Sequence, residues 1–203
     1  MQQPRIFTER LMLRSLEAED APIVTQLAGE KEIAATTLRI PHPYEPGMAE
    51  LWIAGLQQLR VEGRAACFGI CVHQGRELIG CIGLEILREH GRAELGYWIG
   101  KPFWGRGYAT EASAAMIEYA FDMLHLHRVY ASHFATNAAS GRVLEKIGMK
   151  HEGVLREHVE KWGCYHDSVQ WGLTEADYLQ IVSERIQVSD GGGCCGGTGS
   201  GGC

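Results

Sequence analysis

Long apolar runs are missing from this 203-residue sequence. None approaches the roughly 20 residues that a membrane-spanning helix needs. The first residues also lack the charged and apolar regions of a signal peptide. We therefore expect a protein without a membrane partner that works in the cytoplasm.

An excess of positive charge is also missing. The sequence has 25 acidic and 19 basic residues, for a net charge of -6. Proteins that bind nucleic acid normally carry a basic stripe that neutralises phosphates, so the composition argues against nucleic acid as a partner. The negative balance suits a cationic, amine-bearing partner.

The cysteines show no paired framework. Seven is an odd number, and four of them stand singly in apolar, strand-like runs: Cys67, Cys71, Cys81 and Cys164. Such cysteines are normally reduced core thiols. The other three lie in residues 189–203, a stretch of almost only Gly and Cys that is typical of a disordered tail. Their spacing is not that of a zinc site, so we expect no metal.

Residues 1–188 have the periodicity of one folded domain. Strand patterns fall at 6–13, 67–72, 78–87, 93–99, 128–135, 151–159 and 164–172. Helix patterns fall at 18–27, 48–59, 107–124, 138–147 and 174–185. Short turns between the early strands favour antiparallel hairpins. The predicted fold class is α/β, with a mixed, largely antiparallel sheet flanked by helices.

The segment Pro102–Glu111 carries most of the functional information. It follows the apolar run Leu95–Ile99 and leads into a helical pattern, which predicts a strand, a glycine turn and a helix. The first amides of a helix have no internal partner and suit a phosphate. Gly105 and Gly107 remove side chains where the backbone approaches a ligand, and Thr110 adds a hydroxyl.

Two familiar phosphate loops do not fit this segment. A nucleoside-triphosphate loop needs Gly-Lys-Ser/Thr, whereas Tyr108 and Ala109 follow Gly107. A dinucleotide loop needs a third glycine and an acidic residue about 20 positions later. Because Gly-x-Gly alone also occurs at ordinary helix entries, the ligand has to be identified from other segments.

Five segments in the right order provide that identification: Thr8–Arg14, Glu94–Ile99, Trp104–Ala112, Asn137–Met149 and Gly163–Asp167. Over residues 5–185 the sequence resembles the GNAT N-acetyltransferase superfamily, and within it the ribosomal-protein N-terminal acetyltransferases. The resemblance implies acetyl-CoA as co-substrate. It also implies that strands 93–99 and 128–135 are parallel and splay apart, forming the acetyl-CoA slot. Trp104 departs from the superfamily pattern, which usually begins with Gln or Arg.

The resemblance also implies which residues bind the donor. They are Tyr97, Trp98, Ile99, Gly105, Arg106, Gly107, Tyr108, Ala109, Thr110 and Asn137. Exposed amides in the strand would polarise the thioester carbonyl. Asn137 has a compatible alternative role as a helix N-cap. Glu111, in the first helical turn, is interpreted as offsetting the helix dipole.

Glu94 and Ser140 are the candidate catalytic residues. The superfamily often has a catalytic carboxylate at the position of Glu94, and apolar neighbours would raise its pKa. The alternative is a solvated glutamate at a strand end. Ser140 matches an Asn-x-x-Ser pattern and would protonate the leaving thiolate; the alternative is a surface hydroxyl.

The sequence identifies fewer candidate residues for binding the acceptor amine than for binding the acetyl donor. The resembled branch uses a carboxylate nineteen residues after the serine, but Val159 stands there, so that role cannot be transferred. Asp167 or Tyr165 would line the acceptor pocket instead. A Pro-rich segment would supply an acceptor-facing loop with Arg39, His42 and Tyr44.

These features predict an N-acetyltransferase that acts on a primary amine, with the α-amine of a peptide or protein as the leading acceptor. A small-molecule amine such as a polyamine, amino acid or aminoglycoside is an alternative, because the fold does not fix the acceptor. A non-catalytic acyl-CoA-binding module is a third possibility, which the presence of Asn137 and Ser140 disfavours. The resembled branch also suggests a homodimer.

Overall fold

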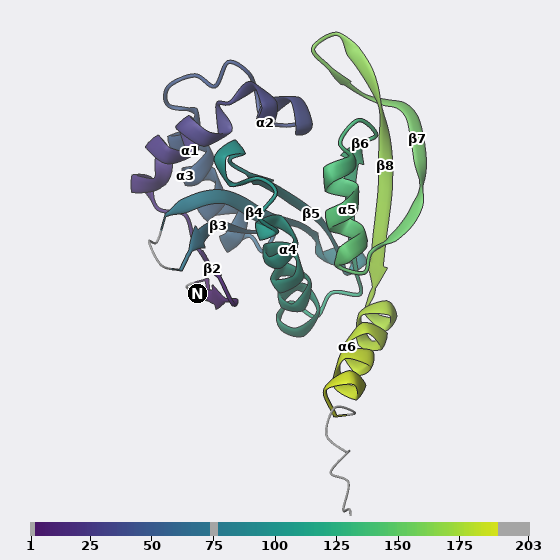
Figure 1. The fold of residues 1–203 in the computed structure, drawn as a ribbon. Coiled ribbons are helices and arrows are strands. Elements are labelled where there is room, and N and C mark those ends of the chain that lie inside the picture. Colours follow the sequence, from purple (N-terminus) through teal and green to yellow (C-terminus); the bar gives the residue numbers. More distant parts are fainter. Residues whose placement is uncertain (1–2, 74–76, 191–203) are drawn as a thin grey trace, which may run out of the picture.

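A single mixed sheet organises the protein. The computed structural model describes residues 3–73 and 77–190, with side-chain environments up to residue 187. Eight strands lie in the order β1-β2-β3-β4-β5-β6-β8-β7 (Figure 1). They are β1 (Ile6–Phe7), β2 (Leu11–Arg14), β3 (Ala65–Val72), β4 (Leu78–Leu87), β5 (Arg92–Ile99), β6 (Arg128–Phe134), β7 (Lys150–Lys161) and β8 (Cys164–Thr174). The α-helices are α1 (Ala21–Ala28), α2 (Lys31–Thr36), α3 (Met48–Val61), α4 (Tyr108–Glu118), α5 (Ala138–Lys146) and α6 (Glu175–Asp190).

The strand pairing confirms the predicted fold class. Strands β1 to β5 pair antiparallel in sequence order, and β6, β8 and β7 form a second antiparallel group. The two groups meet where β5 and β6 run parallel. That parallel pairing covers three residue pairs, from Arg92 opposite Arg128 to Glu94 opposite Tyr130. Beyond Glu94 the two strands have no further paired residues, so they diverge as predicted.

Two apolar clusters cover the two faces of the sheet. Alternate residues of a strand point to opposite faces. On one face, Leu95 and Ile99 of β5 pack with Met116 of α4. On the other face, Cys81 of β4 packs with Val24 of α1. Figure 1 shows α4 on one side of the sheet and α1 with α3 on the other.

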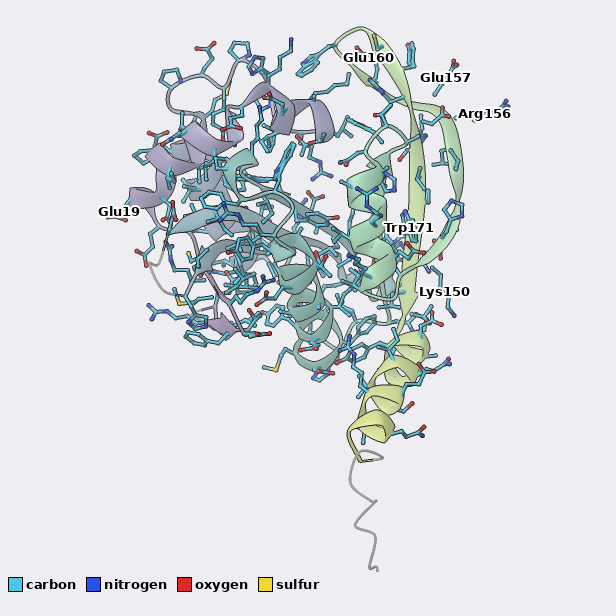
Figure 2. All side chains as sticks on the ribbon, in the orientation of Figure 1. Glu19, Lys150, Arg156, Glu157, Glu160 and Trp171 are labelled. Atoms are coloured by element: carbon cyan, nitrogen blue, oxygen red, sulfur yellow. The ribbon has the colours of Figure 1, made fainter. Side chains whose placement is uncertain are left out.

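The C-terminal part is a long hairpin followed by a helix. Strand β7 has register irregularities between His151 and Gly153 and between Leu155 and Val159. Figure 2 shows Arg156 and Glu157, within the second irregularity, pointing away from the body of the protein. The Glu157 amide donates to the Asp167 carboxylate of β8 at 2.8 Å, which supports the irregular strand.

Helix α6 begins as the sequence predicts. The Thr174 amide donates to Asp177 Oδ2 at 3.1 Å, and the Asp177 amide donates to Thr174 Oγ1 at 3.2 Å. These reciprocal bonds satisfy helix N-terminal donors that would otherwise lack partners. The cap at Thr174 is therefore confirmed.

Some predicted elements differ from the structure. Residues 6–13 are not one strand, because the Thr8 amide donates to the Leu11 carbonyl at 2.9 Å and closes a turn between β1 and β2. Helix α2 was not predicted; it has only six residues and no side-chain N-cap bond. The helix at 107–124 ends in a π-helical turn, Tyr119–Met123.

The predicted tail at 189–203 lies outside the described residues except for its first two positions. Among the helices of the described chain, none has the length and apolarity to cross a bilayer.

Two glycine-to-alanine substitutions should have opposite effects on stability. A Cβ at Gly80 of β4 would lie 2.3 Å from the Trp98 carbonyl oxygen, so the backbone would have to move. We expect Gly80→Ala to lower the free energy of unfolding by about 1–3 kcal/mol. Gly55, inside α3, has no atom within 4 Å of an added Cβ. Gly55→Ala should raise the free energy of unfolding by about 0.5–1 kcal/mol, because it restricts the unfolded chain. Urea unfolding measures both, and equal stability of Gly80→Ala and the parent would contradict the packing described here.

Candidate functional site

The glycine loop joins the end of β5 to the start of α4. It begins with a 3-10 turn, Lys101–Phe103, and continues through Gly105 and Gly107, whose φ angles are 74° and 79°. Those left-handed conformations favour glycine. Gly107 is the N-cap of α4 and supplies no side-chain bond to the first amides of that helix. The predicted strand, glycine turn and helix are confirmed, and amides at a helix N-terminus remain available for an anion.

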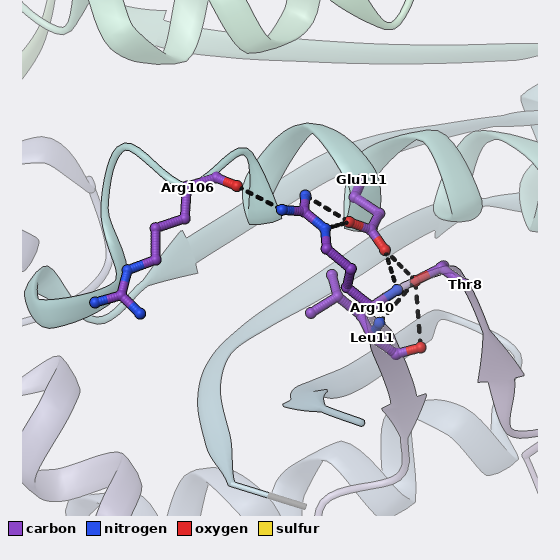
Figure 3. A network of polar contacts seen from close by, with 5 residues as sticks. All are labelled: Thr8, Arg10, Leu11, Arg106 and Glu111. Carbon is purple, nitrogen blue, oxygen red and sulfur yellow. Dashed lines mark hydrogen bonds and ion pairs between the residues drawn. The ribbon is translucent and has the colours of Figure 1, made fainter. Parts of the chain in front are cut away.

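An arginine from the N-terminal hairpin fastens this loop. Arg10 Nη1 donates to the Arg106 carbonyl at 2.9 Å, and Arg10 Nε donates to Glu111 Oε2 at 2.7 Å (Figure 3). Glu111 Oε1 also accepts from Thr8 Oγ1 at 2.6 Å and from the Arg10 amide at 2.8 Å. The Arg10 guanidinium lies over the Tyr108 ring, 4.9 Å from its centre.

This network gives Glu111 a second role beside the predicted dipole interaction. Burial favours the neutral acid, but the bonds from Thr8 and Arg10 outweigh it and lower the pKa of the Glu111 carboxyl. Glu111 is therefore charged at neutral pH. It ties the start of α4 to a hairpin about 100 residues earlier in the chain. The sequence showed both partners but not their contact.

A cavity of about 1170 Å³ connects the predicted site residues. All but one of them line it: Glu94, Tyr97, Trp98, Ile99, Gly105, Gly107, Tyr108, Ala109, Thr110, Asn137 and Ser140. The exception is Arg106. Its Nη2 donates to the Pro102 carbonyl at 3.1 Å and its guanidinium lies over the Phe103 ring, so this side chain folds back onto the loop.

The cavity passes through the gap between β5 and β6. The Gly100 amide donates to Ile79 of β4 at 2.8 Å, so the alternate residues Trp98 and Gly96 also direct their amides toward β4. The amides of Tyr97 and Ile99 then point toward the gap. The Ile99 carbonyl has the same direction and accepts from Trp104 Nε1 at 2.5 Å.

Three polar side chains meet on the α5 side of the gap. The Asn137 Oδ1 atom accepts from the Ser140 amide at 3.2 Å, which confirms Asn137 as the N-cap of α5. Ser140 Oγ and the Tyr97 hydroxyl are 2.8 Å apart. Burial raises the pKa of Tyr97 to about 12, although its bond with Ser140 opposes the shift. Tyr97 therefore stays protonated near neutral pH and has a hydrogen to donate to Ser140.

Glu94 lies on the opposite face of β5. Its pairing partner on β4 is Glu85, so two carboxylates are adjacent on the same face. Arg39 contacts Glu85 directly, and its Nη2 lies 3.9 Å from Glu94 Oε2. The Glu94 side chain is 33% exposed, and the residue lines the cavity. Glu85 was not identified from the sequence because its role depends on strand register.

The loop containing Arg39 is held by a buried lysine from the β7–β8 hairpin. Lys161 Nζ donates to the carbonyls of Thr37, Leu38 and Ile40 at 2.9, 3.0 and 2.7 Å. Burial lowers the pKa of this ammonium, while the three carbonyls satisfy its donors. Because Thr37 is the C-cap of α2, the positive charge also suits the helix dipole.

The other predicted acceptor residues divide into two groups. Tyr44 and Arg39 line the cavity, whereas the exposed His42 packs near Trp162 with ring centres 6.2 Å apart. Of the described hairpin residues, Asp167 and Tyr165 lie outside the cavity lining. Asp167 bonds to the β7 backbone, and Tyr165 is 69% exposed. The expectation that Asp167 or Tyr165 lines the acceptor pocket finds no support in this cavity, which Val159 and Ser168 line from this hairpin.

Within residues 3–73 and 77–190, no group of three or more His, Cys, Asp or Glu side chains is arranged to hold an ion.

Comparisons with known proteins agree with this geometry. Residues 10–150 match the family model of the acetyltransferase (GNAT) domain. An uncharacterized N-acetyltransferase of Bacillus licheniformis is 33% identical over 174 residues, covering 85% of this chain and 97% of that protein. The ribosomal protein uS5-alanine N-acetyltransferase of Escherichia coli is 29% identical over 185 residues, covering 86% and 92%. A solved spermidine N-acetyltransferase chimera, from Vibrio cholerae and hSSAT, has a TM-score of 0.72 and 26% identity, covering 83% of this chain and 98% of that chain.

The thiol of Cys67, which lines the cavity, should react slowly. Burial raises its pKa to about 12, so at about pH 8 roughly one Cys67 in 10,000 is a thiolate. We expect iodoacetamide to label Cys67 at least about 100-fold more slowly than the exposed Cys164. Peptide mass spectrometry measures both rates. The Cys67 rate should rise about tenfold per pH unit, and equal rates for the two cysteines would contradict the burial.

Proposed function

This chain belongs to the GNAT acetyltransferase family and is an acyltransferase, and from that premise we propose that it acetylates the α-amine of a peptide or protein. The observation that carries the proposal is the cavity, which joins the glycine loop to Glu94 through the gap between β5 and β6. The 29% identity to the Escherichia coli ribosomal-protein alanine acetyltransferase supports a protein acceptor. A ribosomal-protein acceptor would imply a cytoplasmic location.

The residues around the gap fit acetyl-CoA, which supplies an acetyl thioester when bound. In our proposal the amides of Tyr108, Ala109 and Thr110, at the start of α4, hold the pyrophosphate together with the Gly105–Gly107 backbone. An added Cβ at Gly105 has no atom within 4 Å, which indicates open space beside the loop. The Tyr97 and Ile99 amides and Asn137 hold the pantetheine arm, and Trp98 contributes a cavity wall.

The two catalytic groups act from opposite faces of the sheet. Glu94 accepts a proton from the attacking amine on the face covered by α1 and α3. Ser140 donates a proton to the leaving thiolate on the face covered by α4 and α5. Tyr97 is a positioning residue, because its hydroxyl oxygen lies 2.8 Å from Ser140 Oγ. When Tyr97 donates in this bond, the serine hydrogen is left free to point toward the thiolate. Its pKa of about 12 keeps that donor protonated throughout the neutral range.

We propose residues 1–188 as one catalytic domain. The family model covers residues 10–150, and β7, β8 and α6 complete the sheet and its packing. A homodimer remains a prediction, to be tested by the mass of the protein in solution.

Removing either proton-transfer group should slow turnover without weakening donor binding. We expect Glu94→Gln and Ser140→Ala each to lower kcat by roughly 10²–10⁴-fold, the usual contribution of general acid–base catalysis. The assay follows CoA thiol release with N-terminal peptides, amino acids, spermidine and an aminoglycoside as acceptors. Acetyl-CoA affinity, measured by titration calorimetry, should change little. Thiol release from spermidine but not from peptides would contradict the peptide acceptor, and full activity of both variants would contradict the assigned roles.

Substitution of Arg10 should weaken the binding only of acetyl donors that are long enough to contact the glycine loop. Arg10→Ala removes the bonds that fix the Arg106 carbonyl and Glu111, so donor binding must also order the loop. We expect roughly tenfold weaker binding of acetyl-CoA, the effect of about 1.4 kcal/mol, and unchanged binding of S-acetylpantetheine, which lacks the pyrophosphate. The exposed Arg5 provides the matched control, Arg5→Ala. Equal weakening of both donors would contradict a role at the pyrophosphate.

A further inference from the structure

A row of small residues crosses the sheet face that lies under α1 and α3. Cys67 of β3 pairs with Gly83 of β4, and Gly83 pairs with Gly96 of β5. A Cβ placed on Gly96 would meet no atom within 4 Å, so the space above it is open. A Cβ on Gly83 would lie 3.3 Å from the Ala66 carbonyl oxygen and 3.4 Å from Cys67 Cβ, so the open space is centred on Gly96. Gly96 therefore forms the floor of a shallow trough, which Gly83 and Cys67 continue toward β3, and all three residues line the cavity.

The walls above this trough are apolar. Tyr44, Trp52 and Leu56 line the cavity from the loop before α3 and from α3 itself. All three are half-buried and pack against the apolar cluster on this face. Trp98, two residues after Gly96 on the same face, closes one end. We call this part of the cavity, bounded by these walls and the Cys67–Gly83–Gly96 row, the acceptor chamber.

The other end of the acceptor chamber is acidic. Glu85 lies two residues after Gly83, and Glu94 lies two residues before Gly96. Because β4 and β5 are antiparallel, the two carboxylates are neighbours on the same face, next to the two glycines. Arg39 makes its close contact with Glu85 and lies 3.9 Å from Glu94, so Glu94 is the carboxylate left to face an incoming amine. A proton acceptor thus stands directly beside an apolar space.

We propose that the acceptor chamber receives a large apolar side chain next to the reacting amine, so that the enzyme prefers peptides beginning with Leu, Met or Phe. This inference rests on the proposed function and specifies its acceptor. Such a side chain would exchange water for the apolar walls. An N-terminal Ala or Ser would leave the trough unfilled. A polyamine would bring a second ammonium into an apolar space whose second carboxylate is already paired with Arg39.

The test compares peptides that differ only in the first residue. The full chain is assayed for CoA thiol release with peptides beginning with Ala, Ser, Leu, Met or Phe, and with spermidine. We expect kcat/KM for the Leu, Met and Phe peptides to exceed that for the Ala peptide by about tenfold or more, since two further buried methylenes correspond to that factor. Spermidine should be the poorest acceptor. Equal or better use of Ala, Ser or spermidine would overturn the proposal.

Two substitutions that fill the acceptor chamber provide the structural control. Gly96→Leu and Cys67→Leu should each lower the Leu-to-Ala preference by about tenfold, because a side chain would occupy the trough. Cys67→Leu lies on β3, away from the donor, and serves if Gly96→Leu disturbs β5. The matched control is Ala54→Leu, on the exposed side of α3, which should leave the preference unchanged. An unchanged preference in both filled variants would overturn the proposal.

The experiment separates failure of this inference from failure of the proposed function. Thiol release that favours Ala, Ser or spermidine overturns the acceptor chamber but keeps the acetyltransferase. No thiol release from any peptide, with acetyl-CoA binding intact by calorimetry, overturns the peptide-acetylating function and the inference with it.

Discussion

The divergence of β5 from β6 is the constraint on which the site depends. Strand β5 stays paired with β4 up to Ile99, and β6 stays paired with β8 up to Phe134. Both strands are therefore held in place by their outer neighbours, while their mutual pairing ends at Glu94 and Tyr130. Backbone groups on the facing edges have lost a strand partner, and buried groups of this kind require another. An extended amide-containing chain meets that requirement, because its own amide groups can replace the missing strand.

The gap also separates the proposed donor-binding residues on one face of the sheet from the proposed acceptor-binding residues on the other. On one face lie the glycine loop before α4 and, at the start of α5, Asn137 and Ser140. The other face presents Glu94, with walls from α3 and the loop around Arg39. Lys161 donates to three backbone carbonyls of that loop, so the β7–β8 hairpin fixes the position of the loop that contains Arg39. The geometry of each face is thus set by elements that are remote in the sequence.

Local signals account for what the sequence could predict. The glycine turn, the Asn137 cap and the Thr174 cap each depend on residues within a few positions, and all three are confirmed. Contacts such as Arg10 with Glu111 or Lys161 with Thr37 join residues more than 100 positions apart, so no local pattern marks them. The alternation of apolar and polar residues also does not reveal where the chain reverses. In the β1–β2 hairpin Ile6 pairs with Leu13, yet the alternation continues through the turn, so the sequence predicted one strand.

The pairing of Glu85 with Glu94 shows how register and loop position depend on each other. Like charges directly opposite on neighbouring strands destabilise a sheet. Arg39 offsets that repulsion by contacting Glu85 and approaching Glu94, but it can do so only while its loop lies over the sheet. Lys161 keeps the loop there. The loop that positions Arg39 beside Glu85 and Glu94 also supplies a wall of the acceptor chamber. Acceptor recognition and the position of the proposed base are therefore structurally coupled.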